Sequence, residues 1–342
     1  PASNFAFGWN VGLRGDEGGA EHNQRTADLV KDSGFGWVRF QIEWQSFERQ
    51  PEQWDPLPTD RKIDELSSQG LKILICVAKA PEWALSAEDG QFLRDYEEFG
   101  RFMAFVGNRY KGKVQAWEIW NEQNLAIEVN GYVSVGEYVK LIKAGYTSLK
   151  AVDPDAMVLF GGLTPNGVND PTIAVDDAQY LRDAYNYNGG EIANYFDILG
   201  VHLNGTHNSP DNTWPDNVGE NEGWNDHPSF FYRRAEELRD IMISVGDSAK
   251  PMWITEVGWS TANMAPGREY GVNNTEEEVA QYLTRALDIA INEWDFVTGA
   301  FIWNLNWATL VEPEHHMYPS SAIREDWSPR PAYDAMKAFP KS

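Results

Sequence analysis

Eight short apolar segments recur along the chain, and each is followed by a segment of helical character. The apolar segments cover residues 5–10, 37–44, 71–77, 113–120, 157–162, 196–204, 251–260 and 298–307. Helices are expected near 27–33, over 58–69, 92–110, 134–151, 177–187 and 229–245, from Thr275, and over 331–338. Strands that alternate with helices form parallel sheets. The sequence therefore predicts an α/β fold, a (β/α)8 TIM barrel with long loops on one face.

The whole chain, residues 1–342, is expected to form one domain. Barrels of this kind routinely exceed about 250 residues as a single unit. No internal repeat or low-complexity linker interrupts the alternation of strands and helices. The continuous apolar run at 71–77 is typical of a strand that is buried on both faces, as barrel strands are.

The strand at 113–120 runs directly into Trp120, Asn121 and Glu122. In a barrel of parallel strands, active sites are built at the edge where the strands end. Glu122 is therefore a candidate catalytic carboxylate. The alternative is a surface glutamate that happens to follow a buried strand.

A second stretch has the same design. The segment 251–260 is an apolar strand that carries Glu256, followed by Gly258 and Trp259. About three βα units of roughly 40 residues fit between Glu122 and Glu256. Two carboxylates at the ends of different strands can face each other across a pocket. Two such carboxyl groups are the catalytic residues that hydrolysis of a glycosidic bond requires.

The motifs Trp-Asn-Glu at 120–122 and Thr-Glu-Val-Gly-Trp at 255–259 resemble those of the glycoside hydrolases of clan A. The resemblance covers nearly the whole chain. It is closest to family 39 and its bacterial relatives, with family 5 as the neighbour. Family 5 often carries a histidine near residues 79–83, where this chain has none. The resemblance implies a retaining β-glycosidase with Glu122 as acid/base and Glu256 as nucleophile.

Two further polar residues match positions of the clan. Arg39 lies inside the second strand, where a charged side chain needs a partner, and the resemblance implies that it supports Glu256. The alternative is an arginine paired with a structural carboxylate. His202 ends the sixth strand and matches a pocket histidine of the clan. The alternative is a buried histidine whose hydrogen bonds are satisfied in the core.

The resemblance also implies two contacts to the sugar at the cleaved bond. Asn121 matches the residue that binds the sugar 2-hydroxyl. Trp303 matches the tryptophan that forms the floor of the subsite for the sugar at the cleaved bond. Asn204 also belongs to the expected binding site, but many members of the clan have a tyrosine there that bonds the nucleophile. This departure leaves open which group holds Glu256 in place.

The chain contains 15 tryptophans, which is the unusual number in its composition. Tryptophans fill cores, but their rings also stack on the apolar faces of sugars while hydroxyl groups find polar partners. We expect Trp9, Trp83, Trp259 and Trp307, which lie at or past strand ends, to add to the substrate-binding surface.

The net charge of −24 restricts the partners of the protein. Nucleic acid and anionic membrane surfaces require basic patches, and no stretch reaches about 18 apolar residues. We therefore expect a carbohydrate substrate, no nucleic acid and no membrane. Polyanionic substrates are disfavoured, although local basic pockets remain compatible with this charge. The oligomeric state stays open.

The sequence indicates no cofactor and no metal. Cys76, the single cysteine, lies in an apolar run and is expected to be a small buried residue. The alternative is an acidic pair that binds a divalent metal, with His315 and His316 near Glu312 and Glu314 as candidate ligands. None of the standard metal-binding motifs occurs, so these histidines are expected to line the cleft.

The loops after the strands suggest how the substrate is cut. The segments 164–176, 205–228, 260–274 and 304–328 carry Trp214, Trp224, Trp259, Trp307 and Trp327. Several aromatic platforms imply several sugar subsites, so we expect an endo-acting enzyme. The alternatives are loops that close a pocket for one terminal sugar, as in an exo-acting β-xylosidase, and a carbohydrate-binding barrel without catalysis.

The expected location of the protein is secreted or extracellular, with the cytoplasm as the alternative. The chain begins Pro1-Ala2-Ser3, without a signal peptide or an initiator methionine, as a processed chain would.

Overall fold

The computed structural model describes residues 4–219, 223–262 and 269–341. Eight parallel strands close into a barrel in the order β1-β12-β11-β10-β7-β6-β5-β2. These strands are β1 (Ala6–Asn10), β2 (Trp37–Glu43), β5 (Lys72–Ala78), β6 (Ala116–Ile119), β7 (Met157–Leu163), β10 (Ile198–Asn204), β11 (Met252–Gly258) and β12 (Val297–Ile302). The predicted TIM barrel is confirmed.

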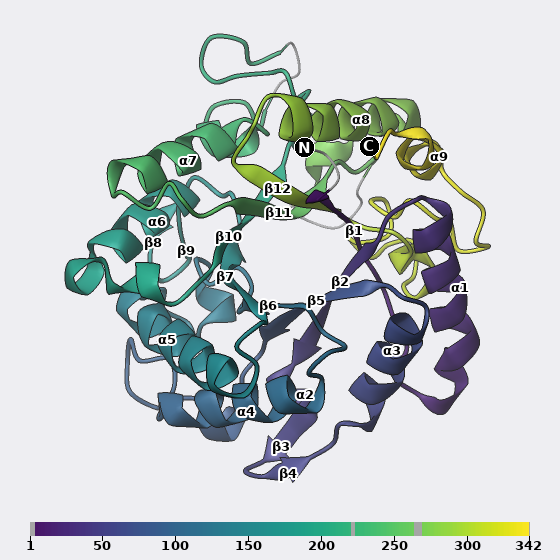
Figure 1. Cartoon of the computed structure of the whole chain (residues 1–342). Coiled ribbons are helices and arrows are strands. Elements are labelled where there is room, and N and C mark those ends of the chain that lie inside the picture. The colour runs from purple at the N-terminus through teal and green to yellow at the C-terminus, as the bar shows by residue number, and fades with distance from the viewer. Residues whose placement is uncertain (1–3, 220–222, 263–268, 342) are drawn as a thin grey trace.

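A helix follows each strand and packs on the outside of the barrel, as Figure 1 shows. The helices are α1 (Ala20–Asp32), α3 (Leu57–Ser68), α4 (Tyr96–Arg109), α5 (Val135–Val152), α6 (Asp177–Asn186), α7 (Arg234–Ser244), α8 (Glu276–Asn292) and α9 (Pro331–Ala338). Within the described ranges, no helix combines the length and apolar character needed to cross a membrane.

Short elements extend the loops at the carboxyl ends of the strands. After β2 come the short helix α2 (Trp44–Phe47) and a hairpin of β3 (Glu48–Gln50) and β4 (Gln53–Trp54). A second hairpin, β8 (Asn169–Asp170) and β9 (Ala174–Val175), follows β7. Residues 220–222 and 263–268 of the long loops predicted on this face lie outside the described residues.

Several element boundaries differ from those expected. β6 begins at Ala116 rather than at 113, because the N–H groups of Lys113 and Val114 donate back to the carbonyl of Tyr110 in a turn after α4. β12 ends at Ile302 rather than at 307, where the chain leaves the barrel through a cis peptide between Trp303 and Asn304. Apolar residues continue past Ile302 at Trp303, Leu305 and Trp307, so the pattern could not mark the end of β12.

Helix α8 begins as expected, because its first turn is capped. Thr275 and Glu278 form a reciprocal capping box, in which each side chain accepts a hydrogen bond from the other residue's backbone N–H. Helix α7 begins at Arg234, five residues later than expected, because Pro228–Phe230 forms a separate 3-10 turn.

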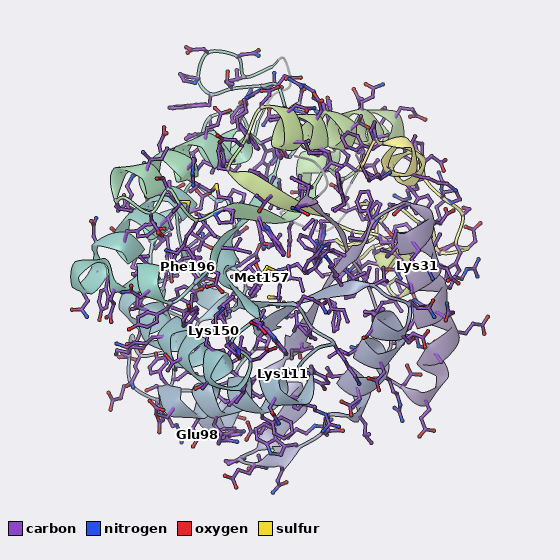
Figure 2. All side chains as sticks on the ribbon, viewed as in Figure 1. Lys31, Glu98, Lys111, Lys150, Met157 and Phe196 are labelled. Carbon is purple, nitrogen blue, oxygen red and sulfur yellow. The ribbon has the colours of Figure 1, made fainter. Side chains whose placement is uncertain are left out.

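Side chains fill the middle of the barrel, so the opening in the ribbon of Figure 1 is not a channel (Figure 2). Near the amino ends of the strands, one buried apolar residue from each of the eight strands packs into a single cluster. We call this cluster the apolar layer: Ala6, Trp37, Leu74, Ala116, Leu159, Ile198, Trp253 and Phe301. Polar side chains occupy the barrel interior nearer the carboxyl ends, and the candidate site is built on them.

Candidate active site

Glu122 is held at the carboxyl end of β6 by unusual backbone geometry. Trp120 and Glu122 both have positive φ angles, 72° and 50°. This region costs a residue other than glycine about 1–3 kcal/mol. Trp120 is fully buried and its indole N–H donates to the carbonyl of Glu128, while the backbone N–H of Glu122 donates to Gly162. These contacts hold the strained turn, which turns the chain out of the strand at Glu122.

Glu256 lies within β11, and its side chain reaches the same place from the other side of the barrel interior. It is 9% exposed. Its neighbour in the ladder between β10 and β11 is His202. Both carboxylates therefore occupy the carboxyl end of the barrel, although the chain separates them widely.

His202 connects the two carboxylates. Its Nδ1 lies 3.1 Å from Glu122 Oε1, and its Nε2 lies 3.6 Å from Glu256 Oε1. The ring fits because residue 162 on the neighbouring strand is glycine, where a Cβ would lie 2.3 Å from His202 Nε2. One oxygen of Glu122 and one of Glu256 are within 4.8 Å of each other.

Arg39 is buried and donates hydrogen bonds to four side chains. Its guanidinium contacts Glu256 at 2.8 Å, Glu118 at 2.7 Å, Asn10 at 2.8 Å and Asn121 at 3.0 Å. Arg39 donates to Glu256 Oε1, while Asn204 lines the cavity nearby.

Glu118 is the partner that Arg39 required, and it was not among the predicted site residues. It is fully buried within β6 and accepts hydrogen bonds from Arg39, the backbone N–H of Gly162 and the hydroxyl of Thr255. The signal was present, since a glutamate in the middle of a buried strand also needs a partner.

The charges of this group perturb the titration of its members. Burial raises the pKa of Glu256, as do the charges of Glu122 and Glu118, while His202 and Arg39 oppose the shift. Burial lowers the pKa of His202, but Glu256 and Glu122 outweigh it, so that this pKa is raised above its ordinary value. Perturbed carboxylates and histidines in a cleft are typical of catalytic sites.

A cavity of about 760 Å³ opens above these residues. Its size falls within the roughly 300–1,000 Å³ of small-molecule sites. Of the residues predicted to bind substrate, several line it: Arg39, Asn121, Asn204, Trp259, Trp303 and Trp307. Glu122 and Glu256 line it too. His202 lies beneath them, in contact with both carboxylates.

Trp9 does not lie at the site, and the prediction that it binds substrate is wrong. Its side chain is fully buried on the outer side of β1, where it stacks on Phe35 and Tyr333 and donates to Ser33 Oγ. The adjacent residue, Asn10, points into the barrel and accepts from Arg39. β1 pairs with both neighbours in regular register, and successive residues of a regular strand face opposite sides, so Trp9 faces outward where Asn10 faces inward.

Trp83 also lies away from the cavity. Its indole N–H donates to the carbonyl of Glu48, and its ring packs edge-on against Trp44. It is part of the packing between the loop after β5 and the segment after β2, and it is not among the residues that line the cavity. The expectation of a contact with substrate is therefore not met.

Some tryptophans of the predicted loops line the cavity, and others lie away from it. Trp224 lines the cavity, as do Trp259 and Trp307. Trp214 is 44% exposed and is absent from the cavity lining. Trp327 packs against His22 and under the guanidinium of Arg25. Trp224 and Trp307 are therefore placed to meet a substrate in the cavity, whereas Trp259 is only 2% exposed and packs against Tyr232 and Tyr282.

Glu122, His202 and Glu256 also offer three metal-ligand atoms within 4.8 Å of one another. The guanidinium of Arg39 contacts Glu256 at 2.8 Å, and its positive charge would repel a divalent cation there. In the described residues, His315 and His316 form no such group. His316 lines the cavity, as expected, and the two rings stack.

No family model matches the chain. Among solved structures, a family 39 glycoside hydrolase from the gut symbiont Bacteroides cellulosilyticus WH2 matches with a TM-score of 0.72 at 21% identity, over 100% of this chain and 64% of that one. A family 39 β-xylosidase from Caulobacter crescentus matches with 0.65 at 14%, over 98% and 71%. Xylanase 10B from Thermotoga maritima matches with 0.61 at 13%, over 99% and 95%.

The chain thus spans about two thirds of the length of the first of these structures and nearly all of the last. At such identities the likeness establishes the fold. The resemblance noted in the sequence is confirmed at that level: the chain shares its (β/α)8 barrel with glycoside hydrolases of clan A.

Proposed function

We propose that the protein is a retaining O-glycosyl hydrolase that cleaves β-glycosidic bonds by double displacement. The observation that carries this proposal is the pair Glu122 and Glu256, whose nearest oxygens lie within 4.8 Å on the cavity wall. Retaining enzymes hold their carboxyl groups about 5–5.5 Å apart, and inverting enzymes about 6.5–9.5 Å. The short spacing favours direct attack by a carboxylate.

In the first step, Glu256 attacks the anomeric carbon and forms a covalent glycosyl ester. The bond to the leaving oxygen breaks, and Glu122 donates its proton to that oxygen. Arg39 contacts Glu256 and supports its ionised form.

In the second step, Glu122 acts as a base. It takes a proton from a water molecule whose oxygen attacks the anomeric carbon, and the bond to Glu256 breaks. The product has the original configuration, and both carboxyl groups return to their starting states. His202, which contacts Glu122 and lies close to Glu256, couples the two charges through both steps.

Asn121 is placed to bind the sugar 2-hydroxyl. Arg39 can only donate hydrogen bonds, so it fixes the amide of Asn121 with Oδ1 toward the guanidinium. The amide nitrogen has no hydrogen-bond partner among the described residues, and Asn121 is one of the residues that line the cavity. A donor held in this way stabilises the transition state, in which the bond to the 2-hydroxyl strengthens.

The substrate we propose is a β-linked polysaccharide or oligosaccharide cut at internal bonds. Three partly or largely exposed tryptophans line the cavity, more stacking surface than one sugar ring uses: Trp224, Trp303 and Trp307. The similar structures include both a β-xylosidase and a xylanase, so an exo-acting enzyme is the alternative. A polysaccharide substrate would place the enzyme outside the cell.

The experiment is a screen of the purified protein on β-linked polysaccharides and aryl β-glycosides. We expect reducing ends to appear, to be unaffected by a chelator and to be lost in Glu256→Ala. Oligosaccharides of mixed length with a rapid fall in viscosity support internal cleavage, whereas release of monosaccharide alone would indicate the exo-acting alternative.

Two further results would reject the mechanism or the enzyme itself. Proton NMR of the first product should show the β-anomer, and the α-anomer would exclude double displacement. Binding of glycans without any hydrolysis would favour the carbohydrate-binding barrel. Loss of activity on chelation would favour a metal at Glu122, His202 and Glu256.

A further inference from the structure

One side of the cavity carries a lysine that the proposed mechanism does not use. Lys62 belongs to α3, and its side chain reaches the cavity wall beside Leu13, Phe40 and Glu43. The residue is half-buried. Lys62 is therefore one of the residues that a substrate in the cavity would meet.

Lys62 has no hydrogen-bond or ion-pair partner among the described residues. Every other lysine in that part of the chain has an acidic, carbonyl, amide or aromatic partner. The net charge of the chain is −24, so acidic partners are plentiful. Among the described lysines, Lys62 is therefore the exception, and no contact that stabilises the fold explains its position in the cavity wall.

The surroundings of Lys62 disfavour the charged form of its ammonium group, because the group is partly buried and forms no ion pair with a described residue. Burial lowers the pKa of its ammonium group, and the charge of Glu43 opposes that shift without forming an ion pair. Glu43 itself accepts hydrogen bonds from Gln45 and Ser46. A partly buried cation is stabilised when an anion arrives with its own hydrogen-bond acceptors.

We propose that Lys62 binds the carboxylate of an acidic sugar, a hexuronic acid unit, that the β-linked substrate carries as an isolated substituent. This inference rests on the proposed glycosidase function and names the substrate class more closely. One unpaired lysine matches one carboxylate. The acidic surface as a whole, and Glu43 beside the site, disfavour a continuous polyanion.

The acidic sugar binds away from the cleaved bond. Arg39, which contacts Glu256, and Glu43, which lies beside Lys62, are four residues apart on β2. At ~3.3 Å per residue this is roughly 13 Å. Lys62 therefore contacts a neighbouring unit or side group of the glycan, and its effect falls mainly on KM.

The test uses acid-bearing β-glycans, such as glucuronoxylan and an acidic arabinogalactan, each in native form and after chemical reduction of its carboxyl groups. Reduction converts the uronic acid into a neutral sugar and leaves the backbone unchanged. We expect the native form of the preferred glycan to be hydrolysed with about tenfold higher kcat/KM, the ratio that one charge-assisted hydrogen bond supplies.

Three variants assign the preference to one residue. Lys62→Met should remove the preference for the native form, and Lys62→Arg should retain most of it. Lys31→Met, on α1 and labelled in Figure 2, removes the same charge from an exposed position and should leave the preference unchanged. Equal rates on native and reduced glycans, or a preference that survives in Lys62→Met, would overturn the proposal.

Binding separates this inference from the proposed function. Affinity electrophoresis of Glu256→Ala on the same glycans should show stronger retardation by the native form, whether or not the wild-type protein hydrolyses them. Retardation without hydrolysis would reject the glycosidase and leave the Lys62 site intact. Hydrolysis, with native and reduced glycans retarding the protein equally, would support the glycosidase and reject the Lys62 site. Neither hydrolysis nor a difference in retardation would reject both proposals.

Discussion

The barrel interior holds two layers that are equally buried and chemically opposite. The apolar layer near the amino ends contains eight residues, and its largest members are Trp37, Trp253 and Phe301. Trp37 packs edge-on against Trp253 at 5.1 Å between ring centroids. Nearer the carboxyl ends lies a layer of Asn10, Arg39, Glu118, His202, Thr255 and Glu256, joined by hydrogen bonds and close charge contacts.

The two layers differ in what burial does for them. Burial of aromatic rings stabilises the fold by roughly 25 cal/mol per Å² of apolar surface. Burial of charges is costly even when they are paired, and such pairs are often no more stable than apolar residues of the same volume. The polar layer therefore indicates function rather than stability.

The largest expected effect is on activity and comes from the polar layer. Glu256→Ala should lower kcat/KM on an aryl β-glycoside by roughly 10⁴-fold or more, as expected when a nucleophile is removed. Its thermal midpoint should match or exceed that of the wild type, because burial raises the pKa of this carboxyl and so opposes its charge. A large fall in the midpoint would show that the polar layer holds the fold together.

Glu122→Ala should separate the two steps of the reaction. A poor leaving group needs protonation, so its hydrolysis should fall by about 10²–10⁴-fold, whereas an activated aglycone needs little. Azide should restore activity on the activated substrate and give a β-glycosyl azide, because azide attacks without a base. Equal losses on both substrates, measured by steady-state kinetics, would count against Glu122 as the acid/base.

Trp253→Ala tests the apolar layer on the same strand as Glu256. The substitution removes a buried indole that contacts Trp37 and Phe301. Loss of such a side chain costs about 3–5 kcal/mol of the free energy of unfolding, which denaturant titration measures. At a temperature where the variant is fully folded, kcat should stay close to that of the wild type. A selective loss of kcat would contradict the division between the layers.

Glu118→Gln should have the smallest overall effect, a shift of the pH profile of activity. The charge of Glu118 raises the pKa of Glu256, so its removal leaves Arg39 acting more strongly on Glu256 and lowers that pKa. Because the nucleophile must be ionised, the acid limb of kcat/KM should move to lower pH. Glu118→Asp keeps the charge and should leave the limb nearer its original position. A limb unmoved in Glu118→Gln would mean that Glu118 serves packing alone.

The sequence by itself determined the order of elements and the two catalytic candidates. Each strand is a contiguous apolar run bounded by glycine or polar residues, and each helix has local end signals such as Thr275 and Glu278. Glu122 and Glu256 were found because they follow such runs directly. The barrel brings the ends of its parallel strands to one face, so local position along the chain was enough.

The tertiary structure alone decided which side chains face the substrate. Barrel strands are buried on both faces, so apolar residues occur on both, and the pattern cannot show that Asn10 points inward and Trp9 outward. The sequence pattern also could not show which loop residues pack at the cavity. Trp224 lines the cavity, whereas Trp327 packs outside it. The pairing of Arg39 with Glu118 depends on distances between residues far apart in the chain, which only the closed barrel sets. The same is true of Lys62, which lines the cavity without an ion-pair partner in the part of the chain that the structure describes.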